Sequence, residues 1–251
     1  MKEEIAVENL REIKGILDKI NIDYWLDMGT LLGAVRDGKI IEWDHDVDLA
    51  TWYGNTKQII SAFPEFRKKG FYVFLGTKRN SIVVTRSGCK ADVYLYRKTD
   101  GYAWLVWIVR EKKLEKVLHS YMAILTRKSH AKPEGRFVRR TLMRFSPLLP
   151  LMLKEFLSYI MSLLDRHAVY YSNRSVIPVT VPKHYFEKLS IIEFYGMKFN
   201  TPSDIEKYLE YRYGSDWKIP IKKWIWYKDD GAVNLNWIGK KSSKNMSIRQ
   251  V

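Results

Sequence analysis

The sequence predicts a mixed fold, α/β (α+β) in class, in which helices flank a sheet of short strands. Three observations predict it. Apolar residues recur with helical spacing near the start of the chain, short runs of β-branched and aromatic residues follow one another between 71 and 109, and a second helical pattern lies between 203 and 214. The 251 residues are enough to bury a full hydrophobic core.

The first two elements are a long helix and a strand. Ala6, Leu10, Ile13, Leu17 and Ile20 recur at steps of 4, 3, 4 and 3, which places them on one face of an amphipathic helix. A short strand over 24–28 and a short helix over 31–36 are expected next, with the sequence Asp-Gly at 37–38 as the stop signal of that helix.

Strands dominate the next part of the chain. The sequence predicts a strand over 47–51 and a helix over 56–69. Four further strands are expected over 71–75, 81–86, 91–96 and 102–109. The pattern becomes basic and helical from 111 to 172, and a last helix is expected after Pro202, with Ser203 and Glu206 as a capping box and Gly214 as its end.

The charge of the chain predicts an anionic partner. The 43 Lys and Arg residues outnumber the 28 Asp and Glu residues and give a net charge of +15. Residues 110–174 alone carry 14 basic and 5 acidic side chains. Nucleic acid, nucleotides, phosphorylated glycans and acidic lipids all fit such a charge. The apolar and basic residues of 139–164 suit peripheral membrane contact and suit equally a buried helix with a charged outer face.

Several classes of protein are excluded by motifs that the chain lacks. With Cys89 as its only cysteine, the chain has no intrachain disulfide and no zinc site built on several thiolates. The longest uncharged apolar stretch, 145–153, has nine residues and is too short to span a bilayer. The acidic start of the chain differs from a signal peptide, so a cytoplasmic protein is expected, with possible association with the cytoplasmic face of a membrane.

A cluster of acids around 44–48 is the sharpest chemical feature. On a strand, Asp46 and Asp48 share one face while Val47 and Leu49 point into the core. Two carboxylates about 4 Å apart repel by about 4 kcal/mol at an effective dielectric near 20, so the pair needs a cation or a raised pKa. Oxygen ligands favour Mg²⁺ or Mn²⁺ over zinc. Asp44 is a further supporting acid.

A third strand acid completes the predicted site. Asp92 lies on the polar face of its strand, because Ala91, Val93 and Leu95 form the apolar face. If the two strands are neighbours, Asp46, Asp48 and Asp92 converge as metal ligands and as catalytic groups for phosphoryl transfer. The alternative is that these acids belong to solvated turns.

The N-terminal end of the short helix is a candidate phosphate site. Backbone N–H groups of Gly29 and Thr30 at a helix start can hold a phosphate, and Arg36, one helical turn further on, can pair with it. The alternative is an ordinary strand-to-helix turn with a surface arginine.

These residues closely resemble the signature of the LicD family. The resemblance rests on Tyr24–Arg36 with its Gly-Thr-Leu-Leu-Gly run, on Ile40–Asp48 and on Ala91–Tyr94, and it returns over 181–186, 194–202 and 208–214. It covers roughly residues 4–110 and 178–220. His45 stands where bacterial members commonly have a further aspartate.

The resemblance implies a nucleotidyltransferase-like fold, in which a small mixed sheet is flanked by helices. It implies that Asp46, Asp48 and Asp92 bind Mg²⁺ or Mn²⁺. It also implies an enzyme that moves phosphocholine, ribitol phosphate or glycerol phosphate from a CDP-linked donor to a sugar hydroxyl of a glycan or lipid-linked glycan, with release of CMP. One domain over 1–239 follows, with a core over 4–110, a basic helical insertion over 111–175, a C-terminal part over 176–239 and a flexible tail over 240–251.

Two other functions fit parts of the sequence. A conventional nucleotidyltransferase with the same carboxylates would transfer the nucleotide itself and release pyrophosphate. A basic nucleic-acid-binding protein would explain the charge but not three acids on strands. Nucleic acid is therefore not expected as a partner.

Overall fold

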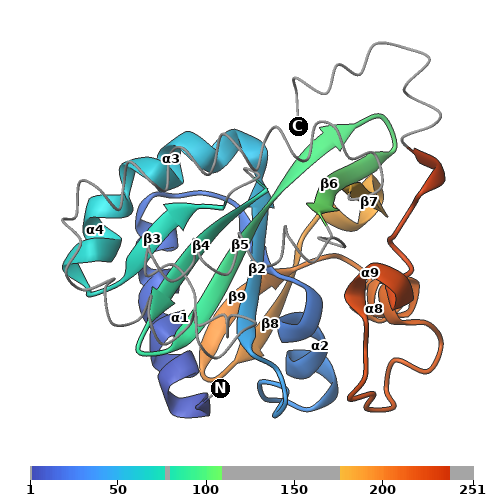
Figure 1. Cartoon of the computed structure of the whole chain (residues 1–251), viewed down its shortest axis with the longest axis horizontal. Helices are drawn as coiled ribbons and strands as arrows, with labels where there is room; N and C mark the ends of the chain where they lie inside the picture. The colour runs from blue at the N-terminus through green and yellow to red at the C-terminus, as the bar shows by residue number, and fades with distance from the viewer. Residues whose placement is uncertain (1, 77–79, 109–175, 238–251) are drawn as a thin grey trace, which may run out of the picture. The chain divides into compact units, whose positions relative to one another are not determined.

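Figure 1 presents the computed structural model, which describes residues 2–76, 80–108 and 176–237. The chain divides into two compact units, Met1–Trp107 with Ile177–Val251, and Ile108–Val176. Everything below concerns the first unit. The predicted basic helical insertion over 111–175, the membrane contact over 139–164 and the tail over 240–251 lie outside the described residues, and the predicted domain limits stay a prediction.

A seven-stranded mixed sheet forms the centre of this unit (Figure 1). Its strands follow the order β1-β2-β5-β4-β3, and β6 pairs with both β5 and β7. Strands β2 and β5 run parallel, whereas β1–β2, β3–β4, β4–β5 and β5–β6 are antiparallel. The strands are β1 (Tyr24–Leu26), β2 (Asp46–Trp52), β3 (Tyr72–Leu75), β4 (Ser81–Arg86), β5 (Cys89–Thr99), β6 (Tyr102–Ile108) and β7 (Val176–Pro182). A separate hairpin consists of β8 (Ser190–Phe194) and β9 (Met197–Thr201).

Helices pack around the sheet and confirm the predicted α+β class. The described helices are α1 (Glu3–Lys19), α2 (Met28–Arg36), α3 (Thr56–Ser61), α4 (Phe63–Lys68), α8 (Ile205–Tyr213) and α9 (Trp226–Asp229), with 3₁₀ turns η1 (Tyr53–Asn55) and η3 (Lys183–Phe186). The apolar face of α1 is buried as its spacing predicts, since Leu10, Ile13 and Leu17 are at most 1% exposed. Within the described ranges, no helix combines the length and apolarity that a bilayer span requires.

The alternating pattern of β2 and β5 positions the site. Val47, Leu49, Ala91 and Val93 are all at most 2% exposed, so one face of both strands belongs to the core. The register pairs Asp48 with Asp92. The period of two residues puts the predicted acids on the opposite face. The pairing of β2 with β5 makes them neighbours on that face.

Three predicted elements differ from the structure. Helix α2 begins at Met28, three residues early, because Asp27 caps it and accepts a hydrogen bond from the Met28 N–H at 2.8 Å. The helix predicted over 56–69 is two helices, α3 and α4, with the break before Pro64, which has no N–H to continue the first one.

The predicted capping box of α8 is wrong. The Ser203 hydroxyl donates to the carbonyl oxygens of His184 and Tyr185, and Ser203 lies one residue before the cap position of the helix. Asp204 occupies the cap position with a left-handed φ of 51° and no side-chain cap bond.

Candidate active site

Three carboxylates meet at the beginning of β2. Oxygen atoms of Asp44, Asp46 and Asp48 lie within 4.8 Å of one another. Asp46 and Asp48 belong to β2, and Asp44 lies in the turn that precedes it. Asp48 is 6% exposed, so this carboxylate sits at the base of the cluster, whereas Asp44 and Asp46 are partly exposed.

The start of α2 holds Asp48 in place. The backbone N–H of Gly29 donates to Asp48 Oδ2 at 3.1 Å, and the Asp48 N–H donates to the Thr30 hydroxyl at 2.8 Å. A Cβ on Gly29 would lie 2.4 Å from Asp44 Oδ2 and 3.3 Å from Asp48 Oδ2. Only glycine lets α2 approach these carboxylates so closely. The predicted role of Gly29 and Thr30 in binding phosphate stays a prediction.

Asp92 is linked to the cluster through a lysine. Lys90 Nζ lies 2.7 Å from Asp46 Oδ2 and 2.6 Å from Asp92 Oδ2. Lys90 and Asp92 are two residues apart on β5, so both side chains emerge on the face that carries Asp46 and Asp48. Asp92 is 5% exposed. It stands beside the group of three carboxylates, and its role as a metal ligand stays a prediction.

The electrostatics of the cluster favour a bound cation. Burial, together with the charge of Asp46, raises the pKa of Asp44 to about 6. Burial and the charges of Asp46 and Asp44 raise the pKa of Asp48 well above its usual range. Burial raises the pKa of Asp92 against the opposing charge of Lys90. Burial opposes the charged form of Lys90, but Asp92 and Asp46 outweigh it and raise the lysine's pKa.

The donor set fits a hard divalent cation. Three carboxylates at ligand-sharing distance supply oxygen atoms alone, which Mg²⁺ and Mn²⁺ prefer. A cation would relieve the mutual repulsion that raises the pKa values of Asp44 and Asp48. Asp44, Asp46 and Asp48 are therefore the residues that could hold it.

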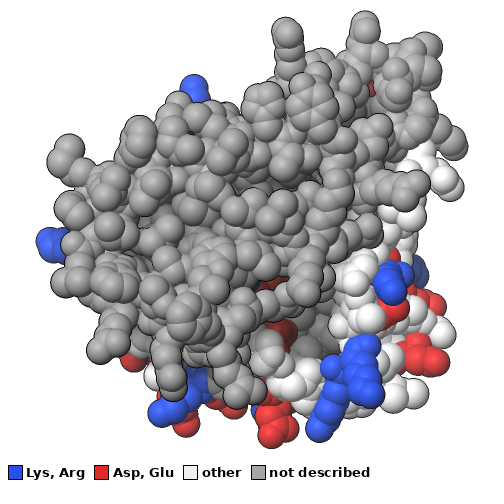
Figure 2. Space-filling view, viewed as in Figure 1, with Lys and Arg blue, Asp and Glu red and all other residues white. Residues whose placement is uncertain are grey.

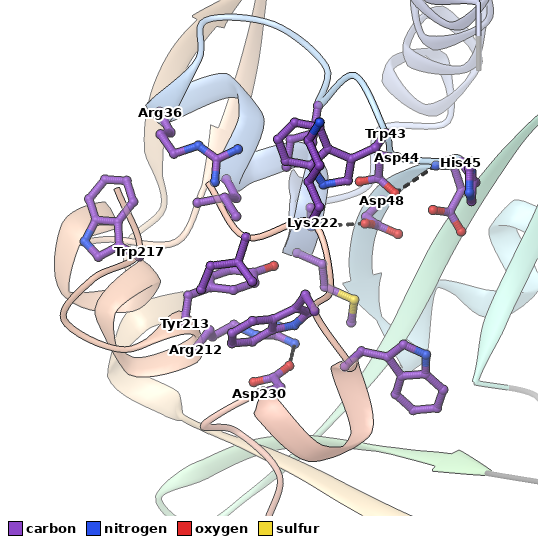
Figure 3. A pocket seen from close by; sticks show the side chains of 18 of the residues that line it. Arg36, Trp43, Asp44, His45, Asp48, Arg212, Tyr213, Trp217, Lys222 and Asp230 are labelled. Atoms are coloured by element: carbon purple, nitrogen blue, oxygen red, sulfur yellow. Dashed lines mark hydrogen bonds and ion pairs between the residues drawn. The ribbon is translucent and has the colours of Figure 1, made fainter. Parts of the chain in front are cut away.

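A cavity of about 580 Å³ opens in front of the carboxylates (Figure 3). Such a volume is typical of small-molecule sites. Asp44 and Asp48 lie beside Trp43 on one side, and Arg212 and Asp230 lie on the opposite side. Aromatic side chains line much of the remaining wall: Trp43, Tyr94, Trp107, Tyr213, Trp217, Trp224 and Trp226.

Basic side chains also reach the cavity. Arg36 lines it and makes two hydrogen bonds to Asp37, from Nε at 2.8 Å and from Nη2 at 2.7 Å. Lys222 Nζ lies 5.1 Å from the centre of the Trp43 ring. The predicted contact of Arg36 with phosphate stays a prediction, since its guanidinium is paired with Asp37.

The charge excess of the chain does not reside in the described residues. These carry 23 basic and 23 acidic side chains, so the net charge of +15 comes from residues outside them. Figure 2 accordingly shows basic and acidic side chains near one another on the described part of this face. Among the described residues, the basic groups at the cavity are individual side chains and not part of a broad positive surface.

A buried network of charged residues, Asp27, Arg212 and Asp230, lies at the wall of the cavity. Arg212 is 1% exposed, and its Nη1 donates to Asp27 Oδ1 at 3.3 Å, while its Nη2 pairs with Asp230. The hydroxyls of Tyr96 and Tyr208 both donate to Asp27. Asp27 caps α2, so this network joins α8 and the residues after α9 to the helix that holds Asp48.

Sequence reasoning missed Lys90, Arg212 and Asp230. Lys90 had a usable signal, because its position two residues before Asp92 places it on the same face of the strand. Arg212 and Asp230 had none, since Arg212 pairs with Asp27, which is 185 residues away, and Asp230 enters the site through its own pair with Arg212. Asp44, Asp46 and Asp48 are brought together and line the cavity with Gly29 and Arg36. Asp92 stands beside them through Lys90, and neither Asp92 nor the buried Thr30 is part of the cavity lining.

Comparisons with known proteins agree with the resemblance. The family model described as "LicD/FKTN/FKRP, nucleotidyltransferase domain" matches residues 21–139. Human "Ribitol 5-phosphate transferase FKRP" is 45% identical over 58 residues, which are 22% of this chain and 12% of that protein. Human "Ribitol-5-phosphate transferase FKTN" is 24% identical over 239 residues, 93% of this chain and 37% of that protein.

A solved structure of the antibiotic-resistance factor ANT(2'')-Ia matches 67% of this chain and 100% of its own chain at 14% identity, with a TM-score of 0.34. The chain spans well under two thirds of the length of both transferases. Residues 21–139, which include Asp44, Asp46, Asp48, Lys90 and Asp92, match the model of the LicD/FKTN/FKRP nucleotidyltransferase domain family.

Proposed function

We propose that the chain is a metal-dependent phosphotransferase that moves a phospho-alcohol from a CDP-linked donor to a sugar hydroxyl of a glycan and releases CMP. The observation that carries the proposal is the cluster of Asp44, Asp46 and Asp48 at one side of an aromatic cavity. The family match over 21–139 supports a transferase, because two relatives are named as ribitol-phosphate transferases. Phosphocholine, ribitol phosphate and glycerol phosphate are the candidate groups.

The carboxylates hold Mg²⁺ or Mn²⁺ in this proposal. Asp46 and Asp48 bind the ion, and Asp44 contributes an oxygen from the preceding turn. A bound ion neutralises the charge of the donor's diphosphate and of the CMP that leaves. Gly29 fixes the orientation of Asp48 through its backbone N–H.

The rest of the cavity binds and orients the two substrates. The aromatic walls offer flat surfaces for the donor's base and for a sugar ring. Arg36 and Lys90 lie at the cavity with groups that can bind phosphate oxygens. The acceptor hydroxyl oxygen attacks the phosphorus that bears the alcohol, and the bond from that phosphorus to the oxygen of CMP breaks. Asp92 takes the hydroxyl proton, a role that suits a carboxyl whose pKa is raised by burial.

Product analysis tests this proposal and separates it from its rival. The purified chain is incubated with Mg²⁺, a panel of sugars and, in turn, CDP-choline, CDP-glycerol, CDP-ribitol and CTP. CMP release from one CDP-alcohol is expected. Release of pyrophosphate from CTP, without CMP release from any CDP-alcohol, would instead establish the conventional nucleotidyltransferase.

Two variants locate the reaction at the carboxylates. Asp46→Asn is expected to lower CMP release by about 100-fold or more, because even groups that only support a metal ligand contribute about 10–100-fold. Asp216→Asn, at an exposed position outside the cavity lining, is the matched control and should retain full activity. Circular dichroism confirms that both variants are folded. A folded Asp46→Asn protein with normal turnover would refute the assignment.

A further inference from the structure

The segment between α8 and α9 exposes large apolar side chains next to lysines. Ile219 is 61% exposed, Ile221 47% and Trp226 42%. Folded domains bury most such side chains, so several of them within one short segment mark a surface that another body covers. We call this surface the α8–α9 patch, and its residues are Lys218, Ile219, Ile221, Lys222, Lys223, Ile225 and Trp226.

The residues of the patch gather at one place in the structure. Ile219, Ile221, Lys222 and Trp226 all line the cavity in front of the carboxylates, so the patch borders the mouth of that cavity. The Trp226 ring packs edge-on against Trp107, with ring centres 4.5 Å apart. Trp226 is thus anchored on the sheet although much of its surface is exposed.

The charge of the patch is basic. Lys222 and Lys223 are exposed and form no ion pair with any described residue, whereas Lys218 lies 3.4 Å from Glu206. The neighbouring acid Asp229 accepts a hydrogen bond from the Ile225 backbone N–H at 2.6 Å and is directed back to its own turn. Figure 2 shows basic side chains, with acidic ones beside them, at the lower right, where the loop that follows α8 lies in Figure 1.

We infer that the α8–α9 patch docks on the surface of a membrane that contains anionic lipid. Isoleucine and tryptophan side chains partition into the boundary between headgroups and acyl chains, and lysines bind the negative headgroups. A membrane fits better than a protein partner because three lysines stand among the apolar side chains of one short segment, Lys218 to Trp226, which lies beside a cavity rather than on a flat apolar face. This docking surface is distinct from the predicted contact over 139–164 and does not depend on the transfer reaction.

Vesicle binding of the full chain tests the inference. Wild-type protein is sedimented with vesicles of phosphatidylcholine alone and with vesicles to which phosphatidylglycerol has been added. Binding only to the anionic vesicles is expected. Two double variants should each lower the partition coefficient on the order of tenfold or more: Ile219→Ser/Ile221→Ser and Lys222→Glu/Lys223→Glu. The first removes apolar area that the membrane buries. The second removes lysines, each of which contributes several-fold near an anionic surface.

Matched variants far from the patch serve as controls. Ile191 on β8 is 67% exposed, which is close to the exposure of Ile219, and Lys198 on β9 is exposed like Lys223. Ile191→Ser and Lys198→Glu should change the partition coefficient by less than about twofold, since neither belongs to the patch. Asp46→Asn should bind vesicles like the wild type, so that loss of transfer and loss of docking are separate results.

Two outcomes overturn the inference. Absence of wild-type binding to anionic vesicles would do so directly. Equal binding of the wild type and both double variants would show that another segment makes the contact and would leave the patch available to a protein partner.

Discussion

Lys90 Nζ lies 2.6 Å from Asp92 Oδ2 and bridges that carboxylate to Asp46, which lies 2.7 Å from the same nitrogen. The lysine thus neutralises two acids on adjacent strands of the sheet. A divalent cation bound to Asp46 would be positively charged, as Lys90 is, and both would interact with the same carboxylate. Lys90 and the cation therefore compete for Asp46 when no substrate is bound.

Replacement of Lys90 by methionine should strengthen metal binding. Without the ammonium, Lys90→Met is expected to bind Mg²⁺ on the order of tenfold more tightly and to be less stable than the wild type in the absence of metal. Thermal melts across a MgCl₂ titration measure both effects. Lys98→Met on the same strand is the control, because Lys98 packs 4.0 Å from the centre of the Trp52 ring. Weaker Mg²⁺ binding by Lys90→Met would contradict the competition.

The effect of Mg²⁺ on stability should increase with pH. The pKa of Asp44 is raised to about 6 and that of Asp48 is raised well above its usual range, so both retain protons at acid pH and must lose them to bind metal. The rise in melting temperature caused by Mg²⁺ should be small near pH 5 and larger near pH 8 by differential scanning fluorimetry. A larger rise at the lower pH would contradict the assigned ligands.

Without metal, the same groups should make stability fall as pH rises. A carboxyl with a raised folded-state pKa binds more protons in the folded than in the unfolded chain between its two pKa values, here between 3.8 and about 6 for Asp44. Stability from this source is complete below the unfolded value and is lost as the pH passes through the folded value. Urea midpoints between pH 4 and 7 measure the trend, and Asp44→Asn should reduce it.

Two glycine-to-alanine variants should differ in their effect on Mg²⁺ binding. A Cβ at Gly29 would meet Asp44 Oδ2 at 2.4 Å, so Gly29→Ala should displace the Asp44 carboxylate and weaken Mg²⁺ binding, with the fold retained. Gly15 lies inside α1 with nothing within 4 Å of its added Cβ. Gly15→Ala should leave Mg²⁺ binding unchanged and add up to about 1 kcal/mol of stability through helix propensity. Isothermal titration calorimetry and urea melts check the pair.

Loss of Arg212 should destabilise the whole fold. Asp27 is fully buried and Asp230 is 5% exposed, so Arg212→Met leaves two buried carboxylates without their cation. The expected cost is about 3–5 kcal/mol in the free energy of unfolding by urea. Arg67→Met, at an exposed position on α4, should cost less than about 0.5 kcal/mol. A loss below about 1 kcal/mol for Arg212→Met would contradict the role of the network.

The sequence predicts the face of the strand on which each acid of the site lies, but not which strands are neighbours. Period-two alternation places Asp46, Asp48 and Asp92 correctly on the polar faces of their strands. Alternation cannot tell which strands are neighbours, and the parallel pairing of β2 with β5 depends on the rest of the sheet. Ser203 is not the cap because the helix begins one residue later, with Asp204 at the cap position. The Ser203 hydroxyl instead donates to two carbonyl groups of η3, a contact that a local pattern cannot reveal.

The pairing of Asp27 with Arg212 also bears on how the protein forms during translation. The family match ends at residue 139 and includes Asp27, the cap of α2. The counter-charge of Asp27 is Arg212, which lies 185 residues later in the chain. The acidic cluster of a nascent chain therefore leaves the ribosome long before Arg212, the counter-charge of Asp27, has been synthesised. Metal loading should then follow release of the C-terminal residues, and a polypeptide trimmed to 21–139 should not acquire a working site.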